Sequence, residues 1–312
     1  MTKGRTLALG LAVVVALTGA LGATATPPGR NGLIAYAKEL RPGHFQLFTI
    51  RPDGSGAKQV THFVSAQNPD WSPNGKTIVA EVESKSGAGI TLLSPTGTVI
   101  RNLTPKGEQG QPSFSPDGKW IVYERDIAPG NNGVWLTRSD GTGLRRVTRN
   151  PFRGGDCGCD TDPNFSPDGK LISFVRIKQD ERQQALFVVR PNGTGLRQVT
   201  PYSWEVATKH DWSPDGKLIL LTTNADFVIP GASANLAAIK PNGTGKTDLT
   251  KFTGGSKNAF AGSFSPDGKQ VVFRLEDGDR YSLAVMNLAT RAITPLTTWP
   301  DKPRFIDWGT HQ

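Results

Sequence analysis

The sequence predicts an all-β protein, a six-bladed β-propeller with four strands in each blade. Three observations predict this fold: a turn motif that occurs five times, a second turn that alternates with it, and a C-terminal segment that supplies the strand missing from the first blade. Repeats with a period of roughly 20–50 residues are typical of solenoids and propellers, and short strands joined by turns favour the propeller.

The first motif is an aromatic residue followed by Ser-Pro, then Asp or Asn, and then Gly-Lys. Its five copies end at Lys76, Lys119, Lys170, Lys217 and Lys269, so that successive copies lie 43, 51, 47 and 52 residues apart. Proline fixes φ near −65° and glycine tolerates positive φ, which together favour a tight turn between two strands. Apolar residues then alternate with a period of two, as Ile121 and Tyr123 do, and this period predicts a strand after each turn.

The second motif is a turn of the Pro-Asp-Gly type, such as Pro52-Asp53-Gly54, that leads into a short strand. That strand ends each time in Val or Leu followed by Thr. The six copies of the ending are Val60-Thr61, Leu103-Thr104, Val147-Thr148, Val199-Thr200, Leu249-Thr250 and Leu296-Thr297. Six endings predict six blades.

The two ends of the chain complement each other. The first blade enters at Asn31 directly on the strand that elsewhere follows the Ser-Pro-Asp-Gly turn, so its innermost strand is missing. Residues Phe305 to Gly309 match an innermost strand, with Trp308 in the place of the repeated aromatic residue, and then the repeat stops. We therefore expect the C-terminal strand to pair with the N-terminal blade and close the ring, which removes exposed strand edges.

This repeat resembles the TolB-like propellers, whose signature is an aromatic residue, Ser-Pro-Asp-Gly-Lys and an Ile-x-Phe strand. The resemblance covers nearly all of residues 31–310 and implies the fold. It does not imply one function, because propellers of this type occur alone, beside a TolB N-terminal domain, or before a peptidase domain. We expect only about five residues, Thr26 to Arg30, between the end of a secretion signal and the first blade, which leaves no room for the TolB N-terminal domain. The Tol partnership is therefore not implied.

The N-terminal segment has the features of a secretion signal. Lys3 and Arg5 precede an apolar stretch that ends at Ala23-Thr24-Ala25, the small-residue pattern that signal peptidase cleaves. We expect residues 1–25 to be a signal peptide, 26–30 a short leader and 31–312 a single propeller domain in a secreted, extracytoplasmic protein. In that oxidising compartment Cys157 and Cys159 are candidates for a small disulfide or for paired loop thiols.

Candidate binding residues lie in the loops that enter the innermost strands and in those that join the second and third strands of each blade. These loops share one end of the ring, which we call the mouth, and they differ in length and charge from blade to blade, as a site that breaks the repeat requires. The candidates are Arg125, Asp126, Asp156, Asp160, Arg176, Lys178, Lys209 and His210.

A second candidate is a ring of polar residues, each directly before the aromatic residue of an innermost strand. Its members are Asp70, Ser113, Asn164, Asp211, Ser263 and Asp307. Six-fold equivalence places them near the central channel. Their oxygens could hold water or a divalent cation, whereas the structural alternative, which we favour, is that each bonds to the backbone of the adjacent blade.

Templates for catalysis and for metal binding are weak. The sequence has no Gly-x-Ser-x-Gly elbow and no His-Glu-x-x-His. Asp160-x-Asp162-x-Asn164 matches only the opening of a calcium loop. We therefore expect no catalytic residue, no protein-bound metal and no cofactor, the channel cation apart.

The preferred function is a non-catalytic platform that binds a protein or a cell-envelope component at the mouth. The net charge of +9, of which Lys3 and Arg5 contribute two, is dispersed and lacks the basic blocks typical of nucleic-acid binders. We expect a monomer with no nucleic-acid partner and no membrane span after cleavage. The alternative is a carbohydrate-active enzyme, a glycoside hydrolase or lyase, with its carboxylates drawn from Asp126, Asp156, Asp160, Asp226, Glu276 and Asp277. A structural propeller within a larger envelope assembly is a third hypothesis.

Overall fold

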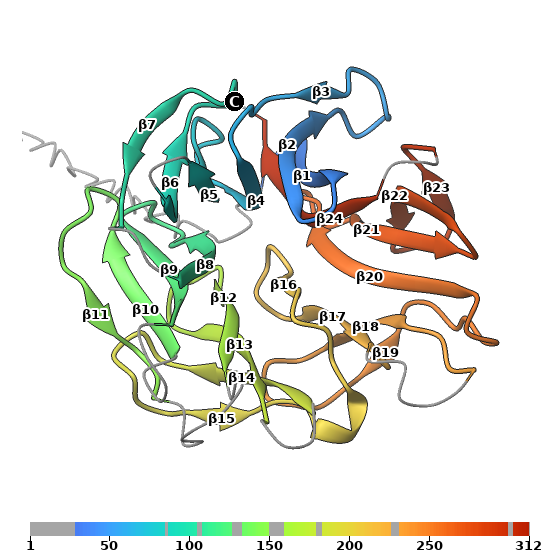
Figure 1. Cartoon of the computed structure of the whole chain (residues 1–312). Helices are drawn as coiled ribbons and strands as arrows, with labels where there is room; N and C mark the ends of the chain where they lie inside the picture. The colour runs from blue at the N-terminus through green and yellow to red at the C-terminus, as the bar shows by residue number, and fades with distance from the viewer. Residues whose placement is uncertain are drawn as a thin grey trace, which may run out of the picture.

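A computed structural model describes residues 29–84, 87–104, 108–126, 133–149, 159–178, 183–225, 231–298 and 302–311, with the backbone alone at 84, 87, 88, 108 and 126. Six four-stranded antiparallel sheets stand around a central channel (Figure 1). The predicted six-bladed propeller is confirmed. The predicted signal peptide lies outside the described residues, and among these no helix has the length and apolar character needed to cross a membrane.

The blades follow the order of the sequence, and each runs from its innermost to its outermost strand. Blade 1 contains β24 (Pro303–Thr310), β1 (Asn31–Arg41), β2 (His44–Ile50) and β3 (Lys58–Gln59); blade 2 contains β4 (Ser65–Trp71), β5 (Ile78–Ser84), β6 (Gly87–Leu93) and β7 (Val99–Asn102); blade 3 contains β8 (Glu108–Phe114), β9 (Trp120–Asp126), β10 (Gly133–Arg138) and β11 (Arg145–Arg146). Blade 4 contains β12 (Asp160–Phe165), β13 (Ile172–Ile177), β14 (Gln184–Val189) and β15 (Arg197–Gln198); blade 5 contains β16 (Asp211–Trp212), β17 (Ile219–Thr223), β18 (Asn235–Ile239) and β19 (Thr247–Asp248); blade 6 contains β20 (Lys257–Phe264), β21 (Gln270–Asp277), β22 (Arg280–Asn287) and β23 (Ile293–Pro295). A 3₁₀ turn, η1 (Tyr202–Trp204), precedes blade 5.

The ring closes as the sequence predicts. Strand β24 pairs antiparallel with β1, with Ile34 opposite Trp308 and Ala35 opposite Asp307. The C-terminal strand is thus the innermost strand of the N-terminal blade.

The repeated turns have the geometry that their residues favour. In blade 3 the Gly118 amide donates to the Ser115 carbonyl at 2.8 Å, and Gly118 has φ of +68°. The Asp117 carboxylate accepts from the Ser115 hydroxyl at 2.6 Å and from the Lys119 amide at 3.1 Å. The acid of the motif therefore fixes the turn from within.

The threonine that ends each outer strand replaces a missing partner in the sheet. The hydroxyl oxygen of Thr148 accepts from the Val134 amide at 3.0 Å, and Thr200 does the same for Leu186 at 2.9 Å. All six repeats make this bond. Because the outermost strands are short, the side chain satisfies an amide that would otherwise lack a partner.

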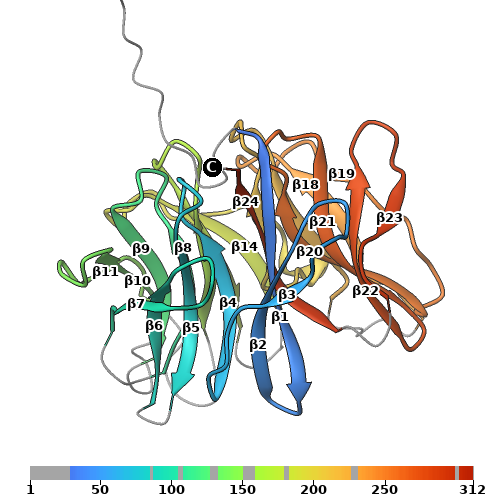
Figure 2. The ribbon, with the colours of Figure 1, turned by 90° about the horizontal axis from the view of Figure 1, so that it is seen from above.

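The core lies between the blades. Each pair of neighbouring blades encloses one cluster of buried apolar side chains, and these clusters follow one another around the ring. Seen from the edge, the strands run from one face of the disc to the other (Figure 2). One face is the mouth; the other carries the Ser-Pro-Asp-Gly turns, and we call it the turn face.

Candidate functional site

The polar ring is buried and joins neighbouring blades. Its six residues are between 1% and 8% exposed. The carboxylates of Asp70, Asp211 and Asp307 each accept, at 2.8 Å, from the backbone amide of the aromatic residue in the next blade. Asn164 instead donates to the carbonyl oxygens of Asp162 and His210. The three carboxylates thus act as links between innermost strands.

Lys209 supplies positive charge to this ring. It is half-buried and stands two residues before Asp211, toward the mouth. Burial opposes its charge, but Asp162 and then Asp307, Asp70 and Asp211 outweigh this effect, so that the pKa of Lys209 is raised. The ammonium group is therefore held in its charged form by the carboxylates around it.

The pKa values of these three carboxyl groups are raised, so they ionise less readily than an exposed aspartate does. Burial, followed by the charge of Asp307, raises the pKa of Asp211 to about 6 and holds that of Asp70 well above its ordinary value. Burial also raises the pKa of Asp307. Among the described residues no group of three or more His, Cys, Asp or Glu side chains is arranged to hold a metal ion. The channel cation stays a prediction, and Lys209 already provides one positive charge there.

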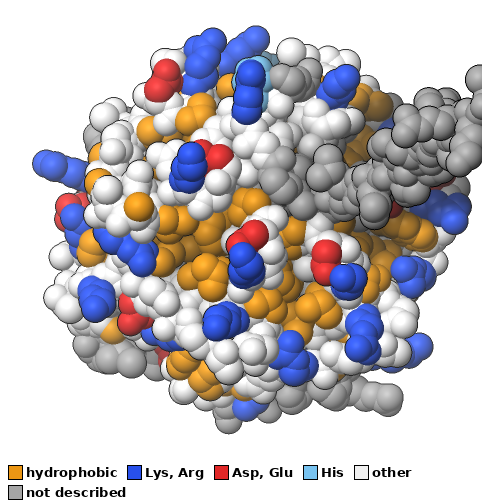
Figure 3. Space-filling view, turned by 180° about the vertical axis from the view of Figure 1, so that it is seen from behind, with side chains coloured by type: hydrophobic (Ala, Val, Ile, Leu, Met, Phe, Trp, Pro, Cys, Tyr) orange, Lys and Arg blue, Asp and Glu red, His pale blue; other side chains and the backbone are white. Residues whose placement is uncertain are grey.

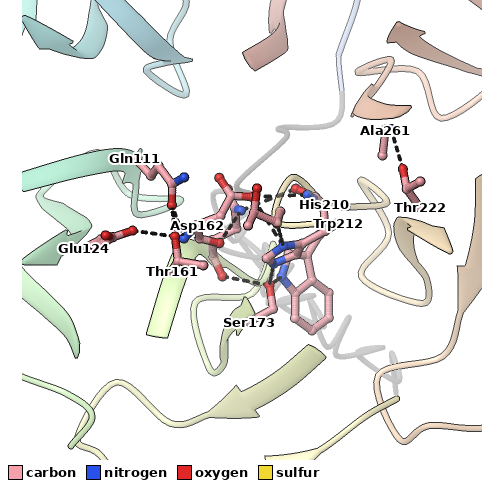
Figure 4. A network of polar contacts seen from close by, with 11 residues as sticks. Gln111, Glu124, Thr161, Asp162, Ser173, His210, Trp212, Thr222 and Ala261 are labelled. Atoms are coloured by element: carbon pink, nitrogen blue, oxygen red, sulfur yellow. Dashed lines mark hydrogen bonds and ion pairs between the residues drawn. The ribbon is translucent and has the colours of Figure 1, made fainter. Parts of the chain in front are cut away.

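Beside the channel lies a polar network that resembles a hydrolytic triad (Figure 4). The Ser173 hydroxyl lies 2.8 Å from Nε2 of His210, and Nδ1 of His210 lies 3.4 Å from the Asp162 carboxylate. Nδ1 also lies 3.0 Å from the Thr208 carbonyl oxygen, which can only accept. In the neutral ring Nδ1 therefore carries the proton, and Nε2 accepts from Ser173.

This network is structural. Ser173 and His210 are fully buried and Asp162 is 6% exposed. The indole Nε1 of Trp212 donates to the Ser173 hydroxyl oxygen at 2.8 Å. A nucleophilic serine must reach a carbonyl carbon, whereas this one is enclosed and already bonded on both sides.

Replacing Ser173 with alanine is expected to lower the free energy of unfolding by about 1–3 kcal/mol, since it leaves the Trp212 indole and the His210 ring without their partner. Chemical denaturation measures the effect, and Ser203→Ala, at an exposed serine, is the control. A fluorophosphonate probe should leave Ser173 of the folded protein unlabelled. Labelling at Ser173 would contradict the structural assignment.

Two of the predicted mouth residues form a buried ion pair. The Asp160 carboxylate accepts from Nε and Nη2 of Arg176 at 2.6 and 2.8 Å, and the residues are 0% and 6% exposed. The guanidinium carbon of Arg176 lies 5.4 and 5.0 Å from the ring centroids of Phe174 and Phe187. In this arrangement neither charge is available to a ligand, and buried His210 is not available either.

The other predicted mouth residues are more accessible or fall outside the described residues. Arg125 and Lys178 are half-buried and lie over the rings of Trp135 at 5.2 Å and Tyr202 at 4.4 Å. Asp156, Cys157 and the side chain of Asp126 lie outside the described residues. Cys159 is 5% exposed and does not carry a free thiol. Its pairing with Cys157 stays a prediction.

Of the carboxylates of the enzyme hypothesis, Glu276 and Asp277 each lie beside a basic side chain. Glu276 lies 3.0 Å from Arg274, and Asp277 lies 3.8 Å from Lys257. Asp226 lies outside the described residues.

The turn face carries hollows between neighbouring blades (Figure 3). Four of them, of about 470, 370, 290 and 420 Å³, are lined by the proline of one turn and by the acid and glycine of the next. On this face apolar patches surround paired acidic and basic side chains (Figure 3). Within one of the turns, the Lys170 ammonium lies 3.1 Å from the Asp168 carboxylate.

Comparison with known proteins agrees with this geometry. The chain is similar to the uncharacterized peptidase YuxL of Bacillus subtilis (strain 168), with 28% identity over 142 residues, which covers 36% of this chain and 21% of YuxL. It thus spans about a fifth of that curated relative. The chain is also similar to the crystal structure of TolB from Acinetobacter baumannii, to which it is 25% identical in sequence. The match has a TM-score of 0.72 and covers 90% of this chain and 67% of that one.

Putative TolB from Agrobacterium tumefaciens matches 86% of this chain and 91% of its own with a TM-score of 0.64, but its identity of 17% shows the fold alone. The model of the TolB beta propeller domain family matches residues 128–311, more than half of the chain. With its six closed blades and its repeated turns, this chain belongs to the TolB beta propeller domain family.

Proposed function

We propose that this protein is exported and acts as a monomeric, non-catalytic platform that holds a protein or a cell-envelope ligand at its mouth. The observation that carries the proposal is the burial of the reactive side chains: the channel carboxylates, the Asp160–Arg176 pair and the Ser173–His210 network are all bonded to one another or to backbone. The loops of the mouth differ between blades, whereas the turns on the opposite face repeat.

The fold supports a role in binding. A propeller presents a broad rigid face on which loops of unequal length can form a site without moving the scaffold. Export is supported by the apolar segment after Lys3 and Arg5 and by its Ala-x-Ala ending. The likeness to YuxL covers only part of that protein, and its name as a peptidase does not extend to this chain.

Arg125 and Lys178 are the predicted mouth cations that keep some exposure. Replacing both with alanine is expected to weaken capture of the envelope partner about fivefold to tenfold, because exposed charge pairs contribute up to about 1 kcal/mol each. Quantitative pull-down from an envelope extract measures the change, and binding should weaken as salt increases.

The matched control is Arg190→Ala with Lys170→Ala, which removes the same charge from the turn face. Normal capture by the mouth variant together with loss in the control would move the site to the turn face. Cleavage of an envelope polysaccharide by the purified protein would replace the binding proposal with the enzyme hypothesis.

A further inference from the structure

Blade 3 departs from the repeat on its outer edge. The residue after the turn lysine is Thr77, Leu171, Leu218 or Gln270 in four blades, but it is Trp120 in blade 3. The guanidinium carbons of Arg138 and Arg145 lie 5.3 and 5.2 Å from the centroid of its ring. Because the repeat supplies the scaffold, a large aromatic residue flanked by two cations at one position calls for a separate explanation.

The two arginines are exposed, and Trp120 is half-buried. Among the described residues neither guanidinium has a carboxylate within ion-pair distance. An arginine that packs over an aromatic ring keeps N–H groups available to a ligand, and the contact limits the freedom that the side chain would lose on binding. Such a pair is prepared to receive carboxylate or phosphate oxygens.

The positive charge continues into blade 2. Nη1 of exposed Arg101 donates to the Asp140 carbonyl oxygen at 2.9 Å, which places it beside the turn that begins at Arg138. The one carboxylate within this group is that of Asp140, and its pKa is lowered first by bonds from Thr142 and then by the charges of Arg138 and Arg101. Three arginines therefore face one carboxylate along the edge.

An apolar hollow adjoins these arginines. It measures about 370 Å³ between blades 3 and 4, and its lining includes Trp120, Leu136, Phe165, Pro116 and Arg145. Leu144, next to Arg145, is 50% exposed. A volume near the lower end of the range of ligand pockets suits one ring of a larger ligand.

Two further carboxylates line the hollow, and both are already balanced. Asp117 and Asp168 accept from the backbone and hydroxyl groups of their own turns. Each also lies beside the lysine of its motif, at 4.0 Å from Lys119 and 3.1 Å from Lys170. The charge of the arginines is thus not cancelled by the turns.

We propose that Arg138 and Arg145, which flank Trp120, form together with neighbouring Arg101 a binding site for an acidic polysaccharide whose sugars carry carboxylate or phosphate groups. The guanidinium edges bind the anionic groups, and the apolar side of a sugar ring packs against Leu144 and the opening of the hollow. A row of charges beside an apolar surface fits an alternating sugar chain better than a nucleic acid, which would need a longer basic track. The site lies outside the mouth and does not rest on ligand binding there.

The test uses the full mature chain and two probes, a short alginate oligosaccharide and a phosphate-bearing wall-polymer fragment, titrated by calorimetry at low salt. Arg138→Ala with Arg145→Ala is expected to weaken binding about tenfold to a hundredfold, which corresponds to about 1.4–2.8 kcal/mol in total, because charge-assisted contacts to the anionic groups are removed. Trp120→Leu, which installs the residue of blade 4, is expected to weaken it about threefold to tenfold by the same relation. Whichever probe binds identifies the anionic group.

The matched control is Arg190→Ala with Arg197→Ala. These arginines occupy the same positions in blade 4, where Arg197 lies opposite Val188 as Arg145 lies opposite Leu136, but Leu171 stands in place of the tryptophan. The control should bind within about twofold of the wild type, an energy difference below about 0.5 kcal/mol, and the arginine variants should melt as the wild type does. The proposal is overturned if neither probe binds, if the control loses as much affinity as the test variant, or if a DNA duplex of equal charge binds as tightly as the glycan.

Discussion

Removing residues 303–312 is expected to prevent the protein from folding, rather than to leave a shorter but folded chain. The deletion takes away β24, in which Ile306 and Trp308 are 2% and 1% exposed. Loss of one buried tryptophan side chain alone costs about 3–5 kcal/mol, and the deletion also exposes the inner edge of β1 along its whole pairing with β24. With a total stability of about 5–15 kcal/mol for a typical protein, the remaining chain should not fold cooperatively.

The deletion also cuts the link from blade 1 to blade 2. The Asp307 carboxylate accepts from the Trp71 amide at 2.8 Å, and Gly309 packs so closely on the Trp71 ring that a Cβ there would lie 2.6 Å from it. Circular dichroism during thermal unfolding, together with gel filtration, measures the outcome. We expect no cooperative transition, and soluble aggregates rather than a compact monomer.

A chain that lacks only residues 311 and 312 is the control. It keeps β24 and loses the bond from the His311 amide to the Arg30 carbonyl oxygen, so its free energy of unfolding should fall by no more than about 1 kcal/mol. If the longer deletion melted cooperatively near the temperature of the full chain, ring closure by β24 would not be what holds the blades together.

The fold could be predicted because each repeat contains the residues that favour its own turns. Pro and Gly in the Ser-Pro-Asp-Gly motif fix the hairpin, and the repeated Thr marks where the outer strand ends, for instance at Thr148 with its bond to Val134. These are local relations between residues close in sequence. Six copies of one local rule determine the architecture without any knowledge of distant contacts.

The side-chain partners at the channel could not be predicted in the same way, because five of the six innermost strands contain an irregularity in their pairing. Asn68, Gln111 and Asp162 have positive φ and interrupt the pairing with the next strand. A shift of one residue turns every following side chain to the other face of the sheet. The sequence analysis assigned Asp160 and Arg176 to the loops of the mouth, whereas in the structure they belong to β12 and β13, where they pair and are buried.

A signal for Lys209 was nevertheless present. Two residues before each member of the polar ring, the six equivalent positions hold Asn68, Gln111, Asp162, Lys209, Ala261 and Phe305, and Lys209 is the one cation among them. Comparing the repeats at the positions two residues before the polar ring would have placed this lysine next to the carboxylates of the ring rather than among the residues of the mouth. Repeat equivalence had already placed Asp70, Asp211 and Asp307 in one ring near the channel, and the effects of these carboxylates on one another's pKa values agree with that placement.

Replacing Lys209 with methionine is expected to destabilise the protein strongly at neutral pH. The variant keeps the length of the side chain but removes the positive charge that favours ionised Asp70, Asp211 and Asp307. Removing one partner from a buried charged group typically costs about 3–5 kcal/mol. Because Lys209 is only half-buried, we expect a loss of about 2–4 kcal/mol in the free energy of unfolding at pH 8.

The loss in the free energy of unfolding caused by Lys209→Met should become smaller as the pH falls. Asp211 has a pKa of about 6 in the folded protein against an ordinary value of 3.8, so the folded state binds its proton more tightly than the unfolded state does. Stability from this group is fully present below the unfolded value and is lost as the pH rises through the folded value. Without Lys209 the pKa values of the three carboxyl groups rise further, so the variant continues to lose stability above pH 6.

Urea denaturation of wild type and variant at pH 5 and pH 8 measures this difference. At pH 5 Asp211 is largely protonated in the folded state, and the deficit of the variant should fall to roughly half of its value at pH 8 or less. Lys209→Arg retains the charge and should preserve the pH profile, whereas Lys170→Met removes an exposed lysine beside Asp168 and should change stability little at either pH. A deficit of equal size at both pH values would show that Lys209 contributes packing alone, and that its charge does not balance the carboxylates of the channel.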